Sequence, residues 1–300
     1  MSIRFDDRVA IVTGAGGGLG RTHALEFARR GAKVVVNDLG GAVDGTGGSS
    51  EAAEKVVAEI KAQGGTAIAN GASVTDDAGV AHLVAQTLDA FGRIDILVAN
   101  AGILRDKSFG KMELKDFAAV VDVHVMGTVK PAKAVWTHMR ERQYGRIVVT
   151  TSSTGLYGNF GQANYGAAKL ALVGLMHTLK LEGAKDNVRT NAVCPVAATR
   201  MTESLMPPPM LEMLKPEYVT PAVVFLSSED APSGVIVTAG AGVFAAAQMV
   251  ETDGVNLGRE ANADAVAAAW SRISDFSAAR PYASGTEQVG KILQRAQTSG

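Results

Sequence analysis

Residues 8 to 20 read R-V-A-I-V-T-G-A-G-G-G-L-G, and this stretch decides the fold. After Arg8, the next five residues are apolar or β-branched, which predicts a short buried strand. The glycine run from Gly14 to Gly20 predicts a tight turn. The following T-H-A-L-E-F-A-R-R predicts a helix that ends at Gly31, as helices often end at glycine. A strand, a glycine turn and a helix therefore open the chain.

A second expected strand, K-V-V-V-N, ends at an acid, Asp38. Glycines let a backbone approach a pyrophosphate, and a helix N-terminus offers unpaired N–H groups and a positive dipole end. A carboxylate about 20 residues further on suits the 2′-hydroxyl of an adenosine ribose and should repel a 2′-phosphate. We therefore expect a cofactor site for NAD rather than NADP, formed by Gly14, Gly18, Leu19, Gly20 and Asp38. Taken alone, the glycine run also fits a connector in some other α/β fold, which is the alternative to a dinucleotide site.

Strands and helices alternate along the chain, which predicts an α/β fold. The expected architecture is a Rossmann-type doubly wound parallel sheet of about seven strands with helices on both faces. A single catalytic domain over residues 1–250 and a C-terminal helical extension over 251–300 are expected. We expect strands near 8–13, 33–37, 66–69, 94–98, 146–150, 188–193 and 234–238, and helices near 19–30, 50–63, 77–91, 114–139, 163–185 and 218–228.

Composition excludes several classes of protein. The net charge is −1, so nothing favours nucleic acid as a partner. Cys194 is the single cysteine, which excludes an intramolecular disulfide, and the five histidines are scattered, so we expect no metal site. The N-terminal M-S-I-R-F-D-D lacks the apolar stretch of a signal peptide. No apolar run reaches the ~20 residues that span a bilayer, and we expect a cytoplasmic protein with no membrane partner.

The run T-T-S-S-T-G-L-Y-G-N-F-G-Q-A-N-Y-G-A-A-K, residues 150 to 169, contains Ser152, Tyr165 and Lys169. On a helix, the tyrosine and the lysine four residues later share one face. A nearby cation lowers the pKa of a phenol from its free value near ~10. Such a phenol can exchange a proton with an alcohol, and the serine could hold the substrate oxygen. Taken alone, the pair also fits a half-buried tyrosine beside a solvated lysine.

Two irregular segments interrupt the pattern. A long glycine-rich loop, L-G-G-A-V-D-G-T-G-G-S, covers residues 39–49. Residues 201–220 are rich in methionine and proline, which excludes a long regular helix there. Methionines adapt to varied apolar shapes, so this segment is either a lid over an apolar substrate or an irregular packing segment.

With these motifs in place, residues 6 to 245 resemble the short-chain dehydrogenase/reductase family. T-G-A-G-G-G-L-G matches its T-G-x-x-x-G-x-G pattern, and A-N-A-G, with Asn100 and Gly102, is similar to its N-N-A-G motif. Ser152, Tyr165 and Lys169 match its catalytic positions. The resemblance implies that Asn100, Gly102, Tyr165 and Lys169 contact NAD, and that the protein forms a homodimer or homotetramer.

A narrower resemblance comes from V-V-V-N-D-L-G-G, N-A-G-I-L-R-D-K-S-F, G-L-Y-G-N-F-G-Q-A-N-Y and L-K-P-E-Y-V. These are similar to the (3R)-hydroxyacyl-CoA dehydrogenase modules of the type 2 peroxisomal multifunctional enzymes, also called 17β-hydroxysteroid dehydrogenases type 4. The resemblance implies NAD-dependent oxidation of (3R)-hydroxyacyl-CoA to 3-ketoacyl-CoA. The alternatives are a 17β-hydroxysteroid or sterol side-chain acyl-CoA dehydrogenase, a β-ketoacyl carrier-protein reductase using NADPH, and a non-catalytic nucleotide-binding protein.

Three positions depart from the wider family. His124 stands where the family usually has a helical Asn, and it either relays protons or fills space. The usual acid at the adenine is Ala72, so the backbone of Ser73 and Val74 is expected to serve instead. The usual P-G motif is P-V here, and the resemblance places Pro195, Ala198 and Thr199 against the nicotinamide.

Overall fold

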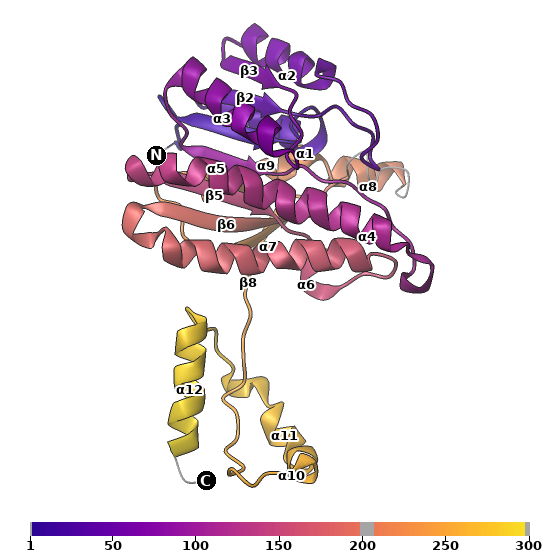
Figure 1. Ribbon diagram of the computed structural model, residues 1–300, viewed down its shortest axis with the longest axis vertical. Helices are drawn as coiled ribbons and strands as arrows, with labels where there is room; N and C mark the ends of the chain where they lie inside the picture. The colour runs from indigo at the N-terminus through magenta and orange to yellow at the C-terminus, as the bar shows by residue number, and fades with distance from the viewer. Residues whose placement is uncertain (1, 199–206, 298–300) are drawn as a thin grey trace. The chain divides into compact units, whose positions relative to one another are not determined.

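The computed structural model in Figure 1 describes residues 2–198 and 207–297, and an eight-stranded sheet runs through the first of its two compact units, Met1–Ala246. The strand order is β3-β2-β1-β4-β5-β6-β7-β8. The strand order therefore reverses between β1 and β4, and ligands bind at such switch points in α/β sheets. The strands are β1 Val9–Thr13, β2 Lys33–Asn37, β3 Thr66–Asn70, β4 Ile96–Ala99, β5 Gly145–Thr150, β6 Val188–Pro195, β7 Ile236–Gly240 and β8 Val243–Ala247.

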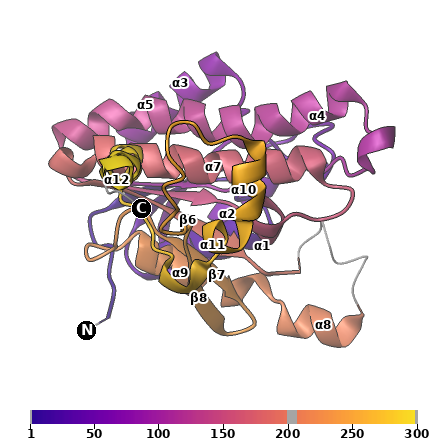
Figure 2. The same ribbon diagram turned by 90° about the horizontal axis from the view of Figure 1, so that it is seen from below.

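Strands β1 to β7 pair in parallel. Every residue of β1, β4 and β5 is buried, as expected for strands that are covered on both faces. Helices cover both faces of the sheet: α3, α5 and α7 lie on one, and α1, α2 and α9 on the other (Figure 2). The predicted doubly wound α/β fold is confirmed. The α-helices that accompany the sheet along the chain are α1 Gly18–Arg29, α2 Glu51–Ala62, α3 Asp77–Phe91, α4 Leu114–Val121, α5 Gly127–Glu141, α6 Ser153–Tyr157, α7 Ala163–Glu182, α8 Pro208–Met213 and α9 Thr220–Leu226.

The expected count of about seven strands misses β8, which reads V-F-A-A-A. This run shows no alternation of apolar and polar residues, so it does not read as a strand. Ala241 and Gly242, the two residues between β7 and β8, both have positive φ, of 50° and 77°. Two-residue turns with positive φ at both positions join antiparallel strands. The local feature that indicates the eighth strand is therefore the two-residue turn before it.

The prediction of one continuous helix over 114–139 is wrong, because the helix is interrupted in its middle. Residues Asp122–Met126 form a π-helical turn between α4 and α5. A π-turn inserts extra backbone into a helix and is frequent at functional sites. His124 lies in this turn and is buried, with 1% of its surface exposed.

Residues Ala247–Gly300 form a second compact unit. Within it, α10 Ala263–Ala268, α11 Trp270–Ile273 and α12 Gly285–Gln297 are helical. Lys291 on α12 donates to the Thr252 carbonyl at 3.0 Å and pairs with the Glu251 carboxylate. A β-bridge joins Glu251 to Arg280. In the described part of the chain, no helix is long and apolar enough to cross a membrane.

Gly174 offers a test of helix energetics away from the cavity. It lies inside α7, and a Cβ added there would meet nothing within 4 Å. Glycine costs about 0.8–1.0 kcal/mol relative to alanine in a helix interior. We therefore expect Gly174→Ala to raise the free energy of unfolding by about 0.5–1 kcal/mol, measured by urea denaturation. An unchanged or lower value would contradict this expectation.

Candidate active site

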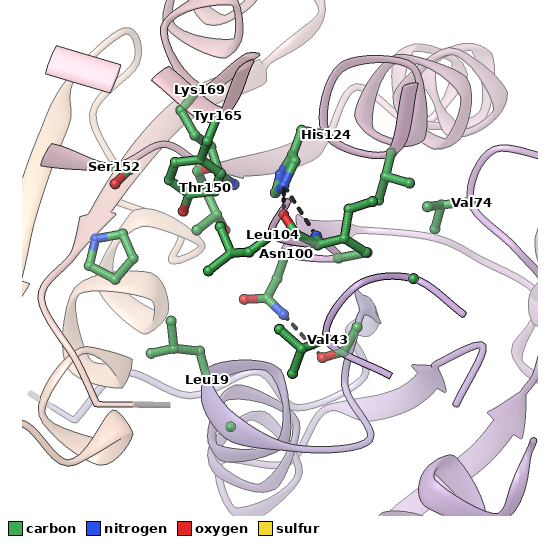
Figure 3. Close-up of a pocket in the computed structure, with 18 of the residues that line it drawn as sticks. Leu19, Val43, Val74, Asn100, Leu104, His124, Thr150, Ser152, Tyr165 and Lys169 are labelled. Carbon is green, nitrogen blue, oxygen red and sulfur yellow. Dashed lines mark hydrogen bonds between the residues drawn. The ribbon is translucent and has the colours of Figure 1, made fainter. Parts of the chain in front are cut away.

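A cavity of about 540 Å³ lies at the carboxyl ends of the central strands (Figure 3). Because parallel strands end at one edge of a sheet, side chains that follow β1, β2, β4 and β5 meet there. Of the expected site residues, the following line this cavity: Gly14, Gly18, Leu19, Asp38, Ser73, Val74, Asn100, Gly102, His124, Ser152, Tyr165, Lys169 and Pro195.

Gly20 lies behind the cavity wall instead. A Cβ at Gly20 would approach the Gly14 carbonyl oxygen to 2.3 Å and Asn100 Nδ2 to 2.7 Å. Gly14 itself has a φ of +62°, in the left-handed region that favours glycine. These two glycines let the turn fold tightly against the strand that ends near Asn100.

The N-terminus of α1 faces the cavity without a cap. Gly17 is its N-cap residue and has no side chain that could cap the helix, and the first turn has no acidic residue. The first N–H groups and the positive dipole end therefore stay available to an anion such as a pyrophosphate.

Asp38 is positioned by two backbone N–H groups. Gly16 N–H donates to its Oδ2 at 2.7 Å, and Gly40 N–H donates to its Oδ1 at 2.6 Å. A carboxylate held on the cavity wall in this way fits a ribose diol, because its oxygens can still accept hydrogen bonds from the two ribose hydroxyls. The glycine turn, the uncapped helix and this carboxylate together fit a dinucleotide.

Asn100 fastens β4 to the glycine turn. Its side-chain amide donates to the carbonyl oxygens of Thr13 at 3.0 Å and Gly14 at 3.1 Å. Gly102, two residues on, makes room for a histidine, since a Cβ there would lie 2.3 Å from Cε1 of His124. Both residues of the motif thus shape the wall that faces the cofactor position.

Ser152, Tyr165 and Lys169 meet at the end of β5 and the start of α7. Ser152 is the N-cap of α6, and its Oγ accepts from the Thr154 N–H at 3.2 Å. Lys169 is 3% exposed, and its Nζ donates to the Thr150 carbonyl at 2.6 Å. Burial lowers the pKa of Lys169 to about 7, so both of its protonation forms are populated near neutrality.

The expectation that Lys169 lowers the pKa of Tyr165 is not what the structure shows. Burial raises the pKa of Tyr165, and a hydrogen bond with the Ser152 side chain opposes that rise. The ammonium lies 5.5 Å from the centre of the phenol ring and donates to Thr150. Among the causes that act on the pKa of Tyr165, only the Ser152 side chain lowers it, and the net effect remains a rise.

His124 packs edge-to-face against Tyr165, with ring centroids 5.2 Å apart. Its Nε2 lies 2.8 Å from the Ile103 carbonyl oxygen and 3.2 Å from the Ile103 backbone nitrogen, while its Nδ1 is buried without a partner among the described residues. Burial and the nearby Lys169 hold its pKa well below the usual range. His124 is therefore a neutral ring, and its relay role stays a prediction.

The loop after β6 carries the remaining expected contacts. Pro195, Val196 and Ala197 line the cavity, whereas Ala198 does not and donates its N–H to the Leu214 carbonyl at 2.6 Å. Thr199 and residues 201–206 of the expected lid lie outside the described residues. From the rest of that segment, Leu214 lines the cavity.

Sequence reasoning missed several residues of the cavity wall. Val43 comes from the 39–49 loop, and Asn159 and Gln162 come from the segment between α6 and α7. The length and glycine content of the loop were signals that it lies near the cofactor. No local signal identified Leu104, which follows the A-N-A-G motif and reaches the cavity only through the fold.

Replacing Ser152 tests its effect on the pKa of the Tyr165 phenol. Ser152→Ala removes the hydrogen bond that lowers the pKa of Tyr165, so that pKa should rise. With Tyr165 as the expected base of an alcohol oxidation, kcat/KM should increase as pH rises through the pKa of the phenol. We expect the variant to lose at least about tenfold in kcat/KM near neutral pH, a loss of about 1.4 kcal/mol, and to reach its plateau at higher pH.

The measurement is a pH profile of kcat/KM from mildly acidic to strongly alkaline pH. Ser277→Ala is the matched control because Ser277 is exposed, belongs to the second unit and does not line the cavity. A plateau at the same pH in Ser152→Ala and the unsubstituted protein would contradict the expectation.

The chain is an oxidoreductase of the short-chain dehydrogenase family, whose model matches residues 8–208. It is 49% identical to peroxisomal multifunctional enzyme A of Dictyostelium discoideum, with 98% of this chain and 66% of that one covered. A putative short-chain type dehydrogenase/reductase of Mycobacterium tuberculosis is 51% identical, with 91% and 96% covered.

Two solved structures support the same placement. The full-length peroxisomal multifunctional enzyme type 2 of Drosophila melanogaster is 37% identical, with a TM-score of 0.82, and covers 98% of this chain. The chain spans 50% of that enzyme. A 7α-hydroxysteroid dehydrogenase, complexed with NADH and 7-oxo glycochenodeoxycholic acid, is 30% identical with a TM-score of 0.72; 80% of this chain and 95% of that one are covered.

Proposed function

We propose that this protein oxidises (3R)-hydroxyacyl-CoA to 3-ketoacyl-CoA with NAD. The observation that carries the proposal is one cavity that holds Ser152, Tyr165 and Lys169 together with the glycine turn and Asp38. The relatives named peroxisomal multifunctional enzymes, of which this chain spans only a part, support the acyl-CoA substrate. Cytoplasmic location and a homo-oligomeric state stay predictions.

The residues divide the chemistry among them. Ser152 holds the substrate hydroxyl, and Tyr165 takes its proton as the alcohol carbon is oxidised. Lys169, whose pKa lies at about 7, gives this end of the cavity a group that can hold or release a proton near neutral pH. Bound NAD would supply the hydride acceptor for the carbinol carbon, while the protein supplies orientation and electrostatics.

Asp38 supports NAD over NADP. Its two oxygens accept backbone N–H groups, which hold its carboxylate on the wall where the adenosine ribose would lie. A 2′-phosphate there would face this carboxylate at close range and be repelled. The adjacent residues Leu39 and Gly40 supply no cation to offset the repulsion.

The test is a turnover screen that follows the absorbance of NADH or NADPH. The substrates are (3R)- and (3S)-hydroxyacyl-CoAs of several chain lengths and a 17β-hydroxysteroid, each with NAD and with NADP, and a 3-ketoacyl carrier protein with NADH and with NADPH. We expect the (3R)-acyl-CoAs with NAD to give the highest kcat/KM. Preference for NADPH and a 3-ketoacyl carrier protein would favour the reductase alternative, and no turnover with any pair would favour the non-catalytic one.

A steroid or sterol side-chain substrate is the second candidate. The observation that favours it is the likeness to a 7α-hydroxysteroid dehydrogenase over 80% of this chain. Higher kcat/KM with the steroid than with every acyl-CoA in the same screen would establish it in place of the first.

A further inference from the structure

Arg105 joins the 39–49 loop to the body of the protein. Its Nε donates to the Asp44 carbonyl at 3.0 Å, and its Nη1 donates to the Asp116 carboxylate of α4 at 3.1 Å. The Asp116 side chain is 15% exposed, so this anchor lies mostly inside the protein. A guanidinium can make both bonds at once because its donors form a rigid planar fork.

The loop that Arg105 holds forms part of the cavity wall. Leu39, Ala42 and Val43 of the loop line the cavity, and Figure 3 shows Val43 beside it. The loop contains no helix or strand across 39–49. Leu104 N–H donates to the Val43 carbonyl at 3.1 Å, and Arg105 donates to the carbonyl of the following loop residue, Asp44. These two neighbouring bonds join the loop to residues 104 and 105.

The same segment also reaches the helix that carries Tyr165. Asn164 is fully buried, and its Nδ2 donates to the backbone carbonyl of Arg105 at 3.0 Å. Its Oδ1 accepts from the N–H of Tyr165 at 2.8 Å. The Arg105 side chain thus holds the loop on one side, while its backbone holds the start of α7 on the other.

We propose that Arg105 is a positioning residue that holds the 39–49 loop against the bound dinucleotide and links that loop to the helix of Tyr165. The inference rests on the proposed use of NAD. Arg105 holds the loop through its side chain and α7 through its backbone carbonyl. A side-chain substitution therefore removes one of the loop's two bonds to residues 104 and 105, which loosens the loop, and leaves the bond to Asn164 in place. Loss of the side chain should therefore affect cofactor retention first.

The experiment compares Arg105→Ala and Arg105→Lys with the unsubstituted protein. NADH binding is measured by fluorescence, its dissociation by stopped flow, and loop opening by hydrogen exchange of the backbone amides of 39–49. We expect roughly tenfold weaker NADH binding with faster dissociation, since a hydrogen bond to a charged group contributes more than a neutral one. Exchange in the loop should accelerate even without NADH. Lysine should rescue only in part, because its single ammonium does not reproduce the fork.

Lys107→Ala is the matched control. It removes one positive charge from the same segment, and its exposed side chain makes neither of the contacts to Asp44 and Asp116. We expect its NADH dissociation and loop exchange to match the unsubstituted protein. Asp116→Asn should reproduce part of the Arg105→Ala effect, and the double variant should be less than additive because the pair shares one contact.

Two failures are distinguishable. If the unsubstituted protein binds no NADH, the proposed function is overturned, and the exchange rates still decide whether Arg105 holds the loop. If NADH binds but Arg105→Ala matches Lys107→Ala in both dissociation and loop exchange, the role of Arg105 is overturned. A thermal melt on each variant separates these outcomes from global unfolding.

Discussion

Tyr165→Phe should lower kcat by roughly 10²- to 10⁴-fold, the range that a positioned acid or base contributes to catalysis. The substitution removes one oxygen and keeps the ring, so the edge-to-face contact with His124 is preserved. NADH should still bind with nearly the affinity of the unsubstituted protein, because the glycine turn and Asp38 are untouched. The measurements are steady-state turnover with a (3R)-hydroxyacyl-CoA and NADH binding by fluorescence.

Tyr144→Phe is the control for this substitution. Tyr144 is 6% exposed and directly precedes β5, so it lies at the opposite end of that strand from Ser152. Its ring lies against the guanidinium groups of Arg8 and Arg146, which the phenylalanine ring can also contact. We expect this variant to turn over normally. A Tyr165→Phe protein that remains as active as Tyr144→Phe would remove Tyr165 from the mechanism.

Gly20→Ala should weaken NADH binding by about 10- to 100-fold. The added Cβ would lie 2.3 Å from the Gly14 carbonyl oxygen, and backbone must shift to relieve that overlap. Inserting a methyl group into a filled site typically costs about 1–3 kcal/mol, and each 1.4 kcal/mol corresponds to a factor of about ten in affinity. The distorted turn would no longer present the first N–H groups of α1 to the pyrophosphate.

Gly174→Ala provides the same chemical change where a Cβ meets nothing within 4 Å. It should bind NADH like the unsubstituted protein, and circular dichroism should show both variants folded. Equal NADH affinity in Gly20→Ala and Gly174→Ala would mean that the tight turn does not form the dinucleotide site.

Most of the sheet was predictable because its signals are local. Short apolar runs located β1 to β7, and their alternation with helices predicted parallel pairing. The eighth strand was missed because V-F-A-A-A carries no strand periodicity. The π-turn at Asp122–Met126 was missed because the sequence continues a helical pattern through it. Only the tertiary structure shows that His124 of this turn packs against Gly102 and Tyr165.

The amino-acid sequence by itself determined the family, the glycine turn with its acid at Asp38, and the spacing of Ser152, Tyr165 and Lys169. Each of these depends on residues that are close in sequence or end on successive strands. Only the tertiary structure decided which neighbours shift the pKa of Tyr165 and which segments hold the 39–49 loop in the cavity wall. The contact of Lys169 with the Thr150 carbonyl and the bonds of Arg105 to Asp44 and Asp116 join separate segments. Burial and hydrogen-bond geometry set their effects, and both arise only when distant segments pack together.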